Sequence, residues 1–233
     1  MCNEINTYNK ERAMKIPYNY LFKQTLKRRT LPRILQNIFL KKISISGDVI
    51  DLGGSEAAQY YSYINTDKVV SMKYADLYKK NDNIINIDFE KKFVIDNKVF
   101  DTVVLMNVVE HVYNYSNLFS ESFRILKNNG RIIGVVPFLY KVHGVPNDYF
   151  RYTYKAIELQ LRNSGFSNIK IVSIGEGPYT AAISFIGHKI KIKPIAYLFY
   201  IFSLWKDNRS FKKNELKDDY PLSYFFEATK EVK

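Results

Sequence analysis

The sequence reads Val49-Ile50-Asp51-Leu52-Gly53-Gly54-Ser55 early in the chain. This apolar run predicts a buried parallel strand over residues 48–52 that ends in a tight turn. A glycine pair at the carboxyl end of a strand lets the backbone approach a ligand without a clash from a Cβ atom. A glycine turn after any strand would look the same, so a purely structural turn stays open as the alternative.

Further apolar runs follow at spacings that predict an alternating α/β chain. We expect strands at 68–72, 84–87, 101–106 and 131–136, and helices at 57–64 and 116–126. Ser116 is the expected N-cap of the second helix, and residues 128–130 are its expected end. Alternation of this kind is typical of a doubly wound parallel sheet.

The chain changes character after Pro137. Residues 154–164 predict a helix, and residues 168–174 and 222–229 predict strands. We expect these two strands to form an antiparallel hairpin across a long apolar and basic insertion at about 178–217. The predicted fold is an α/β domain with a Rossmann-like, seven-stranded, mostly parallel sheet, the last strand antiparallel and helices on both faces.

The residues before this sheet predict a basic helical arm. We expect the arm to span 1–46 and the main domain to span 47–233, with Pro32 beginning the second helix of the arm. The 233 residues carry a formal net charge of +12. Nucleic acid, an anionic membrane, an anionic substrate and a codon bias toward lysine are alternative explanations for that charge.

Several classes of protein are excluded or disfavoured by composition. The single cysteine, Cys2, excludes an internal disulfide framework, and residues 1–20 lack the apolar core of a signal peptide, so we expect a cytoplasmic protein. Cys2 and the three histidines lack ligand partners at short spacing, so we expect no metal site. We expect no nucleic-acid partner, because no known binding module is present.

The nearly all-apolar run at 192–205 lies between lysines and arginines. It is too short to span a membrane, which takes ~20 apolar residues. We favour a helix buried against the sheet or a partner chain. Peripheral membrane contact through residues 189–213 stays open as the alternative, with aromatic rings and basic side chains at the headgroups.

Two later segments combine with the glycine turn. They read Phe100-Asp101-Thr102-Val103-Val104-Leu105-Met106-Asn107-Val108-Val109-Glu110-His111-Val112 and Glu121-Ser122-Phe123-Arg124-Ile125-Leu126-Lys127-Asn128-Asn129-Gly130-Arg131. In this order and at these spacings, the three segments resemble class I S-adenosylmethionine (SAM)-dependent methyltransferases of the type 11 methyltransferase-domain kind. The likeness spans about residues 47–174.

The resemblance implies SAM as the cofactor and assigns residues to hold it. The matching positions are Asp51, Gly53, Gly54 and Ser55 in the SAM loop, Asp88 and Phe89 beside the adenine, and Asn107 and His111 in the segment that closes over SAM. The family also ends its second strand with an acid that holds the ribose. Here the expected strand at 68–72 lacks that acid, and the nearest candidate is Asp76.

The segment after the fifth expected strand bears on the substrate. Residues 137–153 resemble a segment found in methyltransferases of bacterial surface-polysaccharide biosynthesis. His143, Asp148 and Arg151 are the catalytic candidates there: the imidazole can accept a proton from a hydroxyl, and the guanidinium can clamp an anion. The structural alternative is a network in which Asp148 pairs with Arg151.

The sequence therefore predicts a SAM-dependent methyltransferase. The expected reaction is O-methylation of a sugar or a phosphate-bearing glycan precursor, so the acceptor is a small molecule or glycan and anionic. The alternative is a non-catalytic, methyltransferase-like binding or scaffold protein in a glycan-assembly complex. The missing acid at the end of the second strand favours that alternative.

Overall fold

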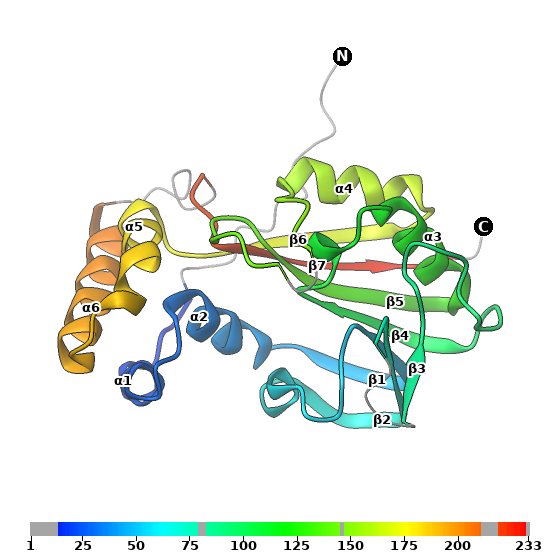
Figure 1. Cartoon of the computed structure of the whole chain (residues 1–233), viewed down its shortest axis with the longest axis horizontal. Coiled ribbons are helices and arrows are strands. Elements are labelled where there is room, and N and C mark those ends of the chain that lie inside the picture. The colour runs from blue at the N-terminus through cyan, green and yellow to red at the C-terminus, as the bar shows by residue number, and fades with distance from the viewer. Residues whose placement is uncertain (1–13, 79–82, 145–146, 211–218, 232–233) are drawn as a thin grey trace, which may run out of the picture.

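The computed structural model describes residues 14–78, 83–144, 147–210 and 219–231. The strands are β1 Ser44–Leu52, β2 Asn65–Asp76, β3 Ile84–Asn86, β4 Phe100–Met106, β5 Leu126–Pro137, β6 Ser167–Ile174 and β7 Ser223–Thr229. The α-helices are α1 Tyr18–Leu26, α2 Leu31–Leu40, α3 Tyr115–Ile125, α4 Tyr154–Asn163, α5 Pro178–Ile186 and α6 Lys193–Ser210. Figure 1 shows these helices arranged around one twisted sheet.

The seven strands form a single sheet in the order β3-β2-β1-β4-β5-β7-β6. Strands β1 to β5 pair in parallel, and β7 pairs antiparallel with both β5 and β6. The predicted sheet is thereby confirmed, including the antiparallel last strand. Because the parallel strands run the same way, their carboxyl ends gather at one edge of the sheet, where ligands bind in open α/β folds.

Each face of the sheet is covered by helices, as predicted. Alternate residues of β4 show why: Val103 and Leu105 belong to a core that includes residues of α3 and α4. Val104 and Met106 belong to a second core, which includes residues of α2, α5 and α6. A central strand with apolar side chains on both faces is stable only between two such layers.

The connection from β1 to β2 differs from the sequence prediction. The expected helix at 57–64 is absent, and a single 3₁₀ turn at Gln59–Ser62 takes its place. The hydroxyls of Tyr60 and Tyr61 both donate to Oδ2 of the buried Asp51, which holds this short segment against the end of β1. With so little chain spent on the crossover, β2 begins at Asn65 and continues to Asp76, beyond the expected end at residue 72.

The ends of α3 also correct the prediction. Its N-cap is Asn114, whose side chain accepts a hydrogen bond from the Asn117 amide, and Ser116 lies inside the helix. The helix ends at Ile125, and β5 begins at the next residue. Residues 128–130, which were expected to end the helix, therefore lie within the strand. Ile125 and Leu126, on the two sides of this junction, are both fully buried in the same core.

The N-terminal helices are close to their predicted positions. Pro32 lies in the first turn of α2, and Ile34 and Leu35 of that helix are fully buried. Strand β1 begins at Ser44 and so crosses residues 46–47. The division into an arm at 1–46 and a domain at 47–233 stays a prediction.

Helix α6 contains residues 193–205 of the apolar run at 192–205. Its residues Ala196, Tyr200 and Leu204 are buried, so the predicted burial is confirmed for this side of the helix. Residues 211–213 of the expected membrane contact and 211–217 of the expected insertion lie outside the described residues. Among the described residues, no helix has the length and hydropathy needed to cross a bilayer.

Candidate functional site

A cavity of about 490 Å³ lies where β1, β2 and β4 end, beside the residues that follow β3. Six of the nine residues that the sequence assigns to the cofactor line it: Gly53, Asp76, Asp88, Phe89, Asn107 and His111. Asp51, Gly54 and Ser55 are not among its lining residues. The tertiary structure thus brings together residues from four segments spread over nearly 60 positions of the sequence.

An acid ends the second strand of the sheet. Strand β2 is longer than the predicted strand at 68–72, and Asp76 is its last residue. Its side chain accepts a hydrogen bond from the Tyr78 amide at 3.1 Å, which fixes the carboxylate at the rim of the cavity. The position therefore matches the strand-end acid that the family resemblance called for.

Asp88 presents a second carboxylate to the same cavity. Its oxygens accept hydrogen bonds from Lys91 Nζ at 2.9 Å and from the Glu90 amide at 3.0 Å. The lysine first, and the amide second, lower the pKa of Asp88 below its usual value. The group is ionised at neutral pH and able to accept a hydrogen bond from a ligand.

The glycine pair and Asp51 have a role in packing. Gly53 has φ +88°, and a Cβ atom there would lie 2.5 Å from Cγ2 of Val108. A Cβ atom on Gly54 would lie 1.8 Å from the carboxylate of Asp51. Burial raises the pKa of Asp51 to about 6, against the hydrogen bonds from the two tyrosines, which lower it. Of this loop, only Gly53 reaches the cavity.

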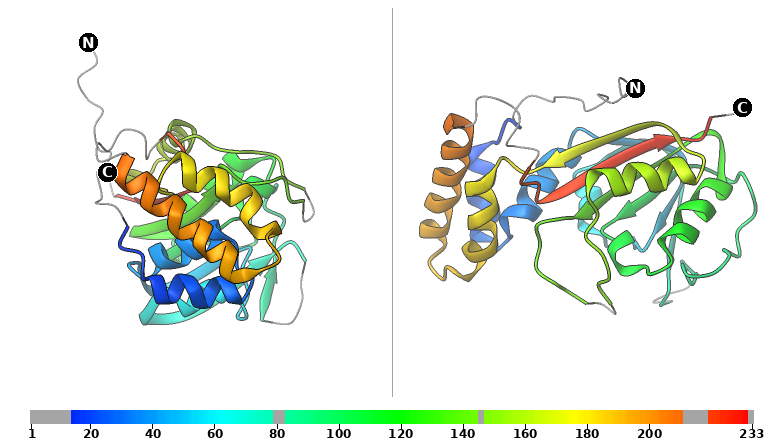
Figure 2. Two further views of the ribbon diagram at one scale, coloured as in Figure 1. Left: turned by 90° about the vertical axis from the view of Figure 1, so that its left-hand side faces the viewer. Right: turned by 90° about the horizontal axis from the view of Figure 1, so that it is seen from above.

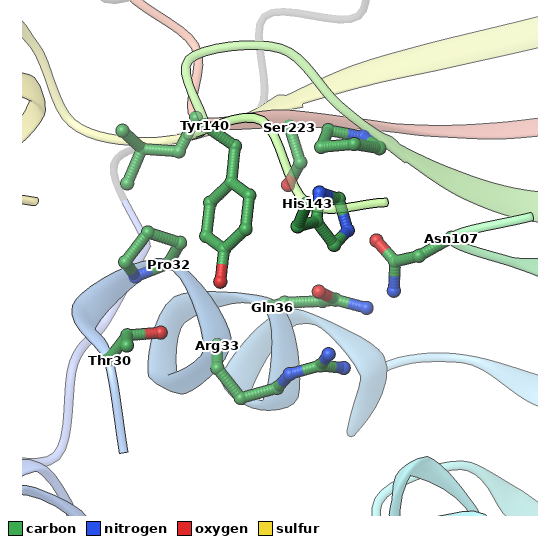
Figure 3. Close-up of a pocket in the computed structure, with 10 residues that line it drawn as sticks. Thr30, Pro32, Arg33, Gln36, Asn107, Tyr140, His143 and Ser223 are labelled. Atoms are coloured by element: carbon green, nitrogen blue, oxygen red, sulfur yellow. The ribbon is translucent and has the colours of Figure 1, made fainter. Parts of the chain in front are cut away.

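A second cavity of about 360 Å³ lies on the other side of Asn107. Its lining residues are Arg29, Arg33, Asn37, Gln59, Tyr60, Met106, Asn107 and His143. A smaller adjoining pocket of about 80 Å³ is drawn in Figure 3, where the amide of Gln36 on α2 points toward Asn107 and His143. Asn107 lines all three spaces.

Asn107 lies at the turn that separates the two larger cavities. It follows directly after β4 and has φ +57°, a left-handed conformation that Asn adopts more readily than most residues. Its backbone amide donates to the Val135 carbonyl at 2.8 Å. The turn is therefore anchored to β5 while the side chain faces both cavities.

His143, Asp148 and Arg151 form one network, as the sequence brought them together. The Asp148 side chain is 2% exposed and accepts hydrogen bonds from both terminal nitrogens of Arg151, one of them at 2.7 Å, and from the His143 amide at 2.8 Å. Arg151 also donates to the carbonyls of Phe150 and Lys141. The predicted anion clamp is thus occupied with acceptors of the protein itself.

His143 lines the second cavity. Its Nδ1 lies 3.2 Å from Oδ2 of Asp148, and the side chain is 34% exposed. Arg151, the backbone amide of His143 and the charge of His143 lower the pKa of Asp148. The carboxylate of Asp148 is therefore placed to orient the imidazole ring from the Nδ1 side.

Glu110 and His111 lie close to His143 and form a polar cluster with it. Both carboxyl oxygens of Glu110 are buried and have no hydrogen-bond partner among the described residues, and burial raises its pKa to about 8. His111 Nε2 lies 3.8 Å from Glu110 Oε1. Together with His143 these side chains offer three ligand atoms within 4.8 Å of one another. The sequence missed this cluster because His143 is 32 positions away.

Sequence reasoning also missed the residues of α2 and of the segment before it. Arg29 and Arg33 line the second cavity, and Arg33 and Gln36 line the smaller pocket that adjoins it. The sequence contained a signal for them only in the basic charge of the N-terminal residues. Nothing in that charge showed that α2 packs beside the carboxyl ends of β4 and β5.

Comparison with known proteins supports the identity of the fold. Residues 53–134 match a family model described as a methyltransferase domain. An uncharacterized protein of Methanocaldococcus jannaschii is 35% identical over 127 residues, which are 53% of this chain and 49% of that protein. The chain thus spans about half the length of this curated relative.

Two solved structures are similar in fold. Phosphoethanolamine N-methyltransferase 2 of Haemonchus contortus, in complex with phosphomonomethylethanolamine and S-adenosylhomocysteine (SAH), has a TM-score of 0.52 and 17% identity, over 84% of this chain and 52% of that chain. The [4+2]-cyclase SpnF has a TM-score of 0.54 and 12% identity, over 87% of this chain and 81% of that chain. The chain therefore has the Rossmann-like fold of SAM-dependent methyltransferases and carries a methyltransferase-domain match over residues 53–134.

Proposed function

We propose that this chain is a SAM-dependent methyltransferase that methylates an oxygen, or with less support a nitrogen, of an anionic small molecule or glycan precursor. One observation carries the proposal. A cavity lined by the predicted cofactor residues and a cavity lined by arginines and His143 meet at Asn107. A methyl donor and an acceptor need this arrangement, because the transfer occurs directly between two bound molecules.

The larger cavity suits the cofactor. Asp76 would accept hydrogen bonds from the ribose hydroxyls, and Asp88 from the adenine amino group, while Phe89 and Val108 supply apolar wall for the adenine. When bound, SAM supplies an electrophilic methyl group on a sulfonium centre. The chain's own contribution on this side is orientation.

The acceptor side suits an anionic hydroxyl compound. Arg29 and Arg33 line it, and no described residue forms an ion pair with either of them in this structure. They are the groups that would hold a phosphate or carboxylate. His143 would accept the hydroxyl proton as the new O–C bond forms, and Asp148 would orient its ring.

The class of acceptor rests on two kinds of support. The complex of the Haemonchus contortus enzyme with phosphomonomethylethanolamine is compatible with a phosphate-bearing acceptor here. The sugar or glycan assignment, and a place in polysaccharide biosynthesis, rest on the resemblance of residues 137–153. A phosphorylated sugar satisfies both.

A non-catalytic binding or scaffold protein is the second candidate. The SAM loop lacks the later glycines usual in the family, and the similarity to a [4+2]-cyclase illustrates that one fold hosts more than one function. The two candidates differ in cofactor binding and in turnover. The presence of Asp76 at the end of β2 favours the methyltransferase.

The test is direct binding followed by turnover. Isothermal titration calorimetry with SAM and SAH should give one site per chain. Asp76→Ala should weaken the binding of SAM and SAH. The control Asp67→Ala, at an exposed position of β2, should leave their binding unchanged. SAH release is then measured with a panel of phosphorylated and unphosphorylated sugars. No binding of either ligand by the folded protein would overturn the proposal, and binding without turnover on any acceptor would favour the scaffold.

A further inference from the structure

The net charge of the protein is concentrated in two segments. Residues 14–42 carry eight Lys and Arg and no acid, and residues 178–210 carry five Lys and Arg and one acid, Asp207. Thirteen bases less one acid is an excess of +12, which equals the formal net charge of the whole chain. All other residues together are therefore neutral. The excess of basic residues is confined to these two segments. A codon bias toward lysine would have spread it along the whole chain.

The one acid in these segments is not at the surface. Asp207 is 1% exposed, and its carboxylate accepts hydrogen bonds from the amides of Tyr179 and Thr180 at 3.0 and 2.7 Å, at the start of α5. The described residues of the two segments thus present basic groups to solvent and no acid.

Helices α1, α5 and α6 form an outer layer at one end of the molecule. They lie side by side in Figures 1 and 2, with α6 packed against both of the others. The ring centroids of Phe22 on α1 and Tyr197 on α6 are 4.9 Å apart. We call the solvent side of these three helices the helical face.

The helical face is apolar as well as basic. The inner side of α6 is buried, yet its outer side exposes Ile195, Leu198, Phe199, Phe202 and Trp205, each between 41% and 63%. Of the 21 large apolar side chains exposed in the described chain, 12 lie on these three helices or at Ile192 beside α6. Clustering of this kind marks a surface that binds a partner or a membrane.

Basic groups flank the apolar stripe at both ends of α6. Lys189 and Lys191 precede the helix, and Lys206 and Arg209 lie in its last turns. Arg209 lies over the ring of Trp205 at 5.5 Å, and Lys206 over the ring of Tyr179 at 5.8 Å. Aromatic rings beside cations are typical of helices that lie at the headgroup level of a bilayer.

We propose that the helical face binds the surface of an anionic phospholipid bilayer, with α6 parallel to the membrane plane and its outer stripe at the boundary between headgroups and acyl chains. Since no described helix can cross a membrane, the contact is peripheral. A second copy of the chain fits less well, because pairing two such faces would oppose like charges. Nucleic acid fits less well, because exposed Ile and Leu side chains gain nothing from phosphates. The inference does not depend on methyl transfer.

The chain contains its own probe, because Trp205 is the single tryptophan and is 47% exposed on the helical face. We expect its fluorescence to shift to the blue when the full-length protein meets vesicles with 30% phosphatidylglycerol in phosphatidylcholine. Brominated acyl chains should quench it. Vesicles of phosphatidylcholine alone should bind far less, and high salt should release the protein from the anionic vesicles.

Paired variants separate the apolar and basic contributions. Leu198→Ser/Phe202→Ser should lower vesicle partitioning in flotation at least 10-fold. Lys189→Gln/Lys191→Gln should lower vesicle partitioning about 5-fold for each lysine replaced. The matched controls are Val70→Ser/Val94→Ser and Lys68→Gln/Lys92→Gln, which change exposed residues of the same types away from these helices and should leave it unchanged.

Folding and competing partners are checked in the same series. Each variant is compared with the wild type by circular dichroism and melting temperature, and only folded variants are scored. Unchanged Trp205 fluorescence at saturating anionic lipid would overturn the proposal, as would equal loss of partitioning in the control variants. A blue shift that grows with protein concentration without vesicles would assign the face to a second copy. Displacement from vesicles by RNA but not by an equal charge of polyphosphate would assign it to nucleic acid.

Discussion

Arg151 donates hydrogen bonds to both carboxylate oxygens of Asp148, whose side chain is 2% exposed. The guanidinium therefore neutralises a buried carboxylate and leaves the acceptor's charge to other residues. Arg29 and Arg33 lie on the acceptor side instead. We therefore propose Arg29 and Arg33, rather than Arg151, as the residues that hold an anionic substrate.

Arg151→Ala should destabilise the protein. The buried carboxylate of Asp148 would lose its charged partner, which costs ~3 kcal/mol in the free energy of unfolding. The folded-state pKa of Asp148 is lowered, so its pairing stabilises the protein above the unfolded pKa and is lost as pH falls toward the folded value. Urea unfolding at pH 6 and at pH 2.5, on either side of the unfolded pKa of 3.8, should show a smaller difference for the variant. Wild-type stability with a raised acceptor KM would return Arg151 to the role of an anion clamp.

Arg33→Gln should raise the KM for the acceptor and leave kcat and SAM affinity nearly unchanged. The side chain lines the acceptor side, is exposed and has no ion-pair partner among the described residues, so its removal does not threaten the fold. Initial rates with a phosphorylated acceptor measure the effect, with Lys27→Gln at an exposed position as the control. An unchanged KM would exclude Arg33 as the anion ligand.

His143→Gln should lower kcat by about 10²–10⁴-fold, the usual contribution of a general base. Gln keeps a polar side chain beside Asp148 but cannot accept the proton at neutral pH. Calorimetry should give the wild-type affinity for SAM, because His143 is not among the residues lining the larger cavity. Full turnover by the variant would mean that the acceptor hydroxyl needs no base from this residue.

Asp76→Asn and Asp88→Ala should each weaken SAM binding by about 1–3 kcal/mol, the cost of a lost hydrogen bond to a buried or charged group. Both residues line the cofactor cavity, and neither belongs to either buried core. Calorimetric affinities for SAM and SAH provide the measurement. If Asp76→Asn binds normally, the acid at the end of β2 serves the fold alone.

Glu110 makes the stability depend on pH in an unusual direction. Its pKa rises from 4.5 to about 8 on folding, because the carboxyl is buried. Between these values the folded state binds more protons than the unfolded state, so the free energy of unfolding should fall as pH rises. Above about pH 8 the loss is complete. Glu110→Gln should show a flatter profile over pH 5–9 in urea titrations, and Glu56→Gln should follow the wild type. A bound cation at Glu110, His111 and His143 would reverse the trend.

The sequence by itself determined the architecture. Strand-length apolar runs around residues 49–55 and 100–106 predicted a parallel sheet, because only strands buried on both faces need apolar side chains at every position. Through the family resemblance of its motifs, it also named six of the residues that line the larger cavity. They come together because the carboxyl ends of parallel strands meet at one edge of the sheet.

Only the tertiary structure decided the local geometry and the second half of the site. Tyr60 and Tyr61 bind the buried Asp51 in a 3₁₀ turn where a helix was expected. Strand β2 continues to Asp76 because it pairs with β1 as far as Ala75 and with β3 at Asp76. Contacts of this kind outweigh the small free-energy differences between local conformations. Arg33, on a helix far earlier in the chain, lines the same cavity as His143 for a similar reason. Long-range packing of α2 places it there, and periodicity within a segment shows which side is apolar but not what that side will meet.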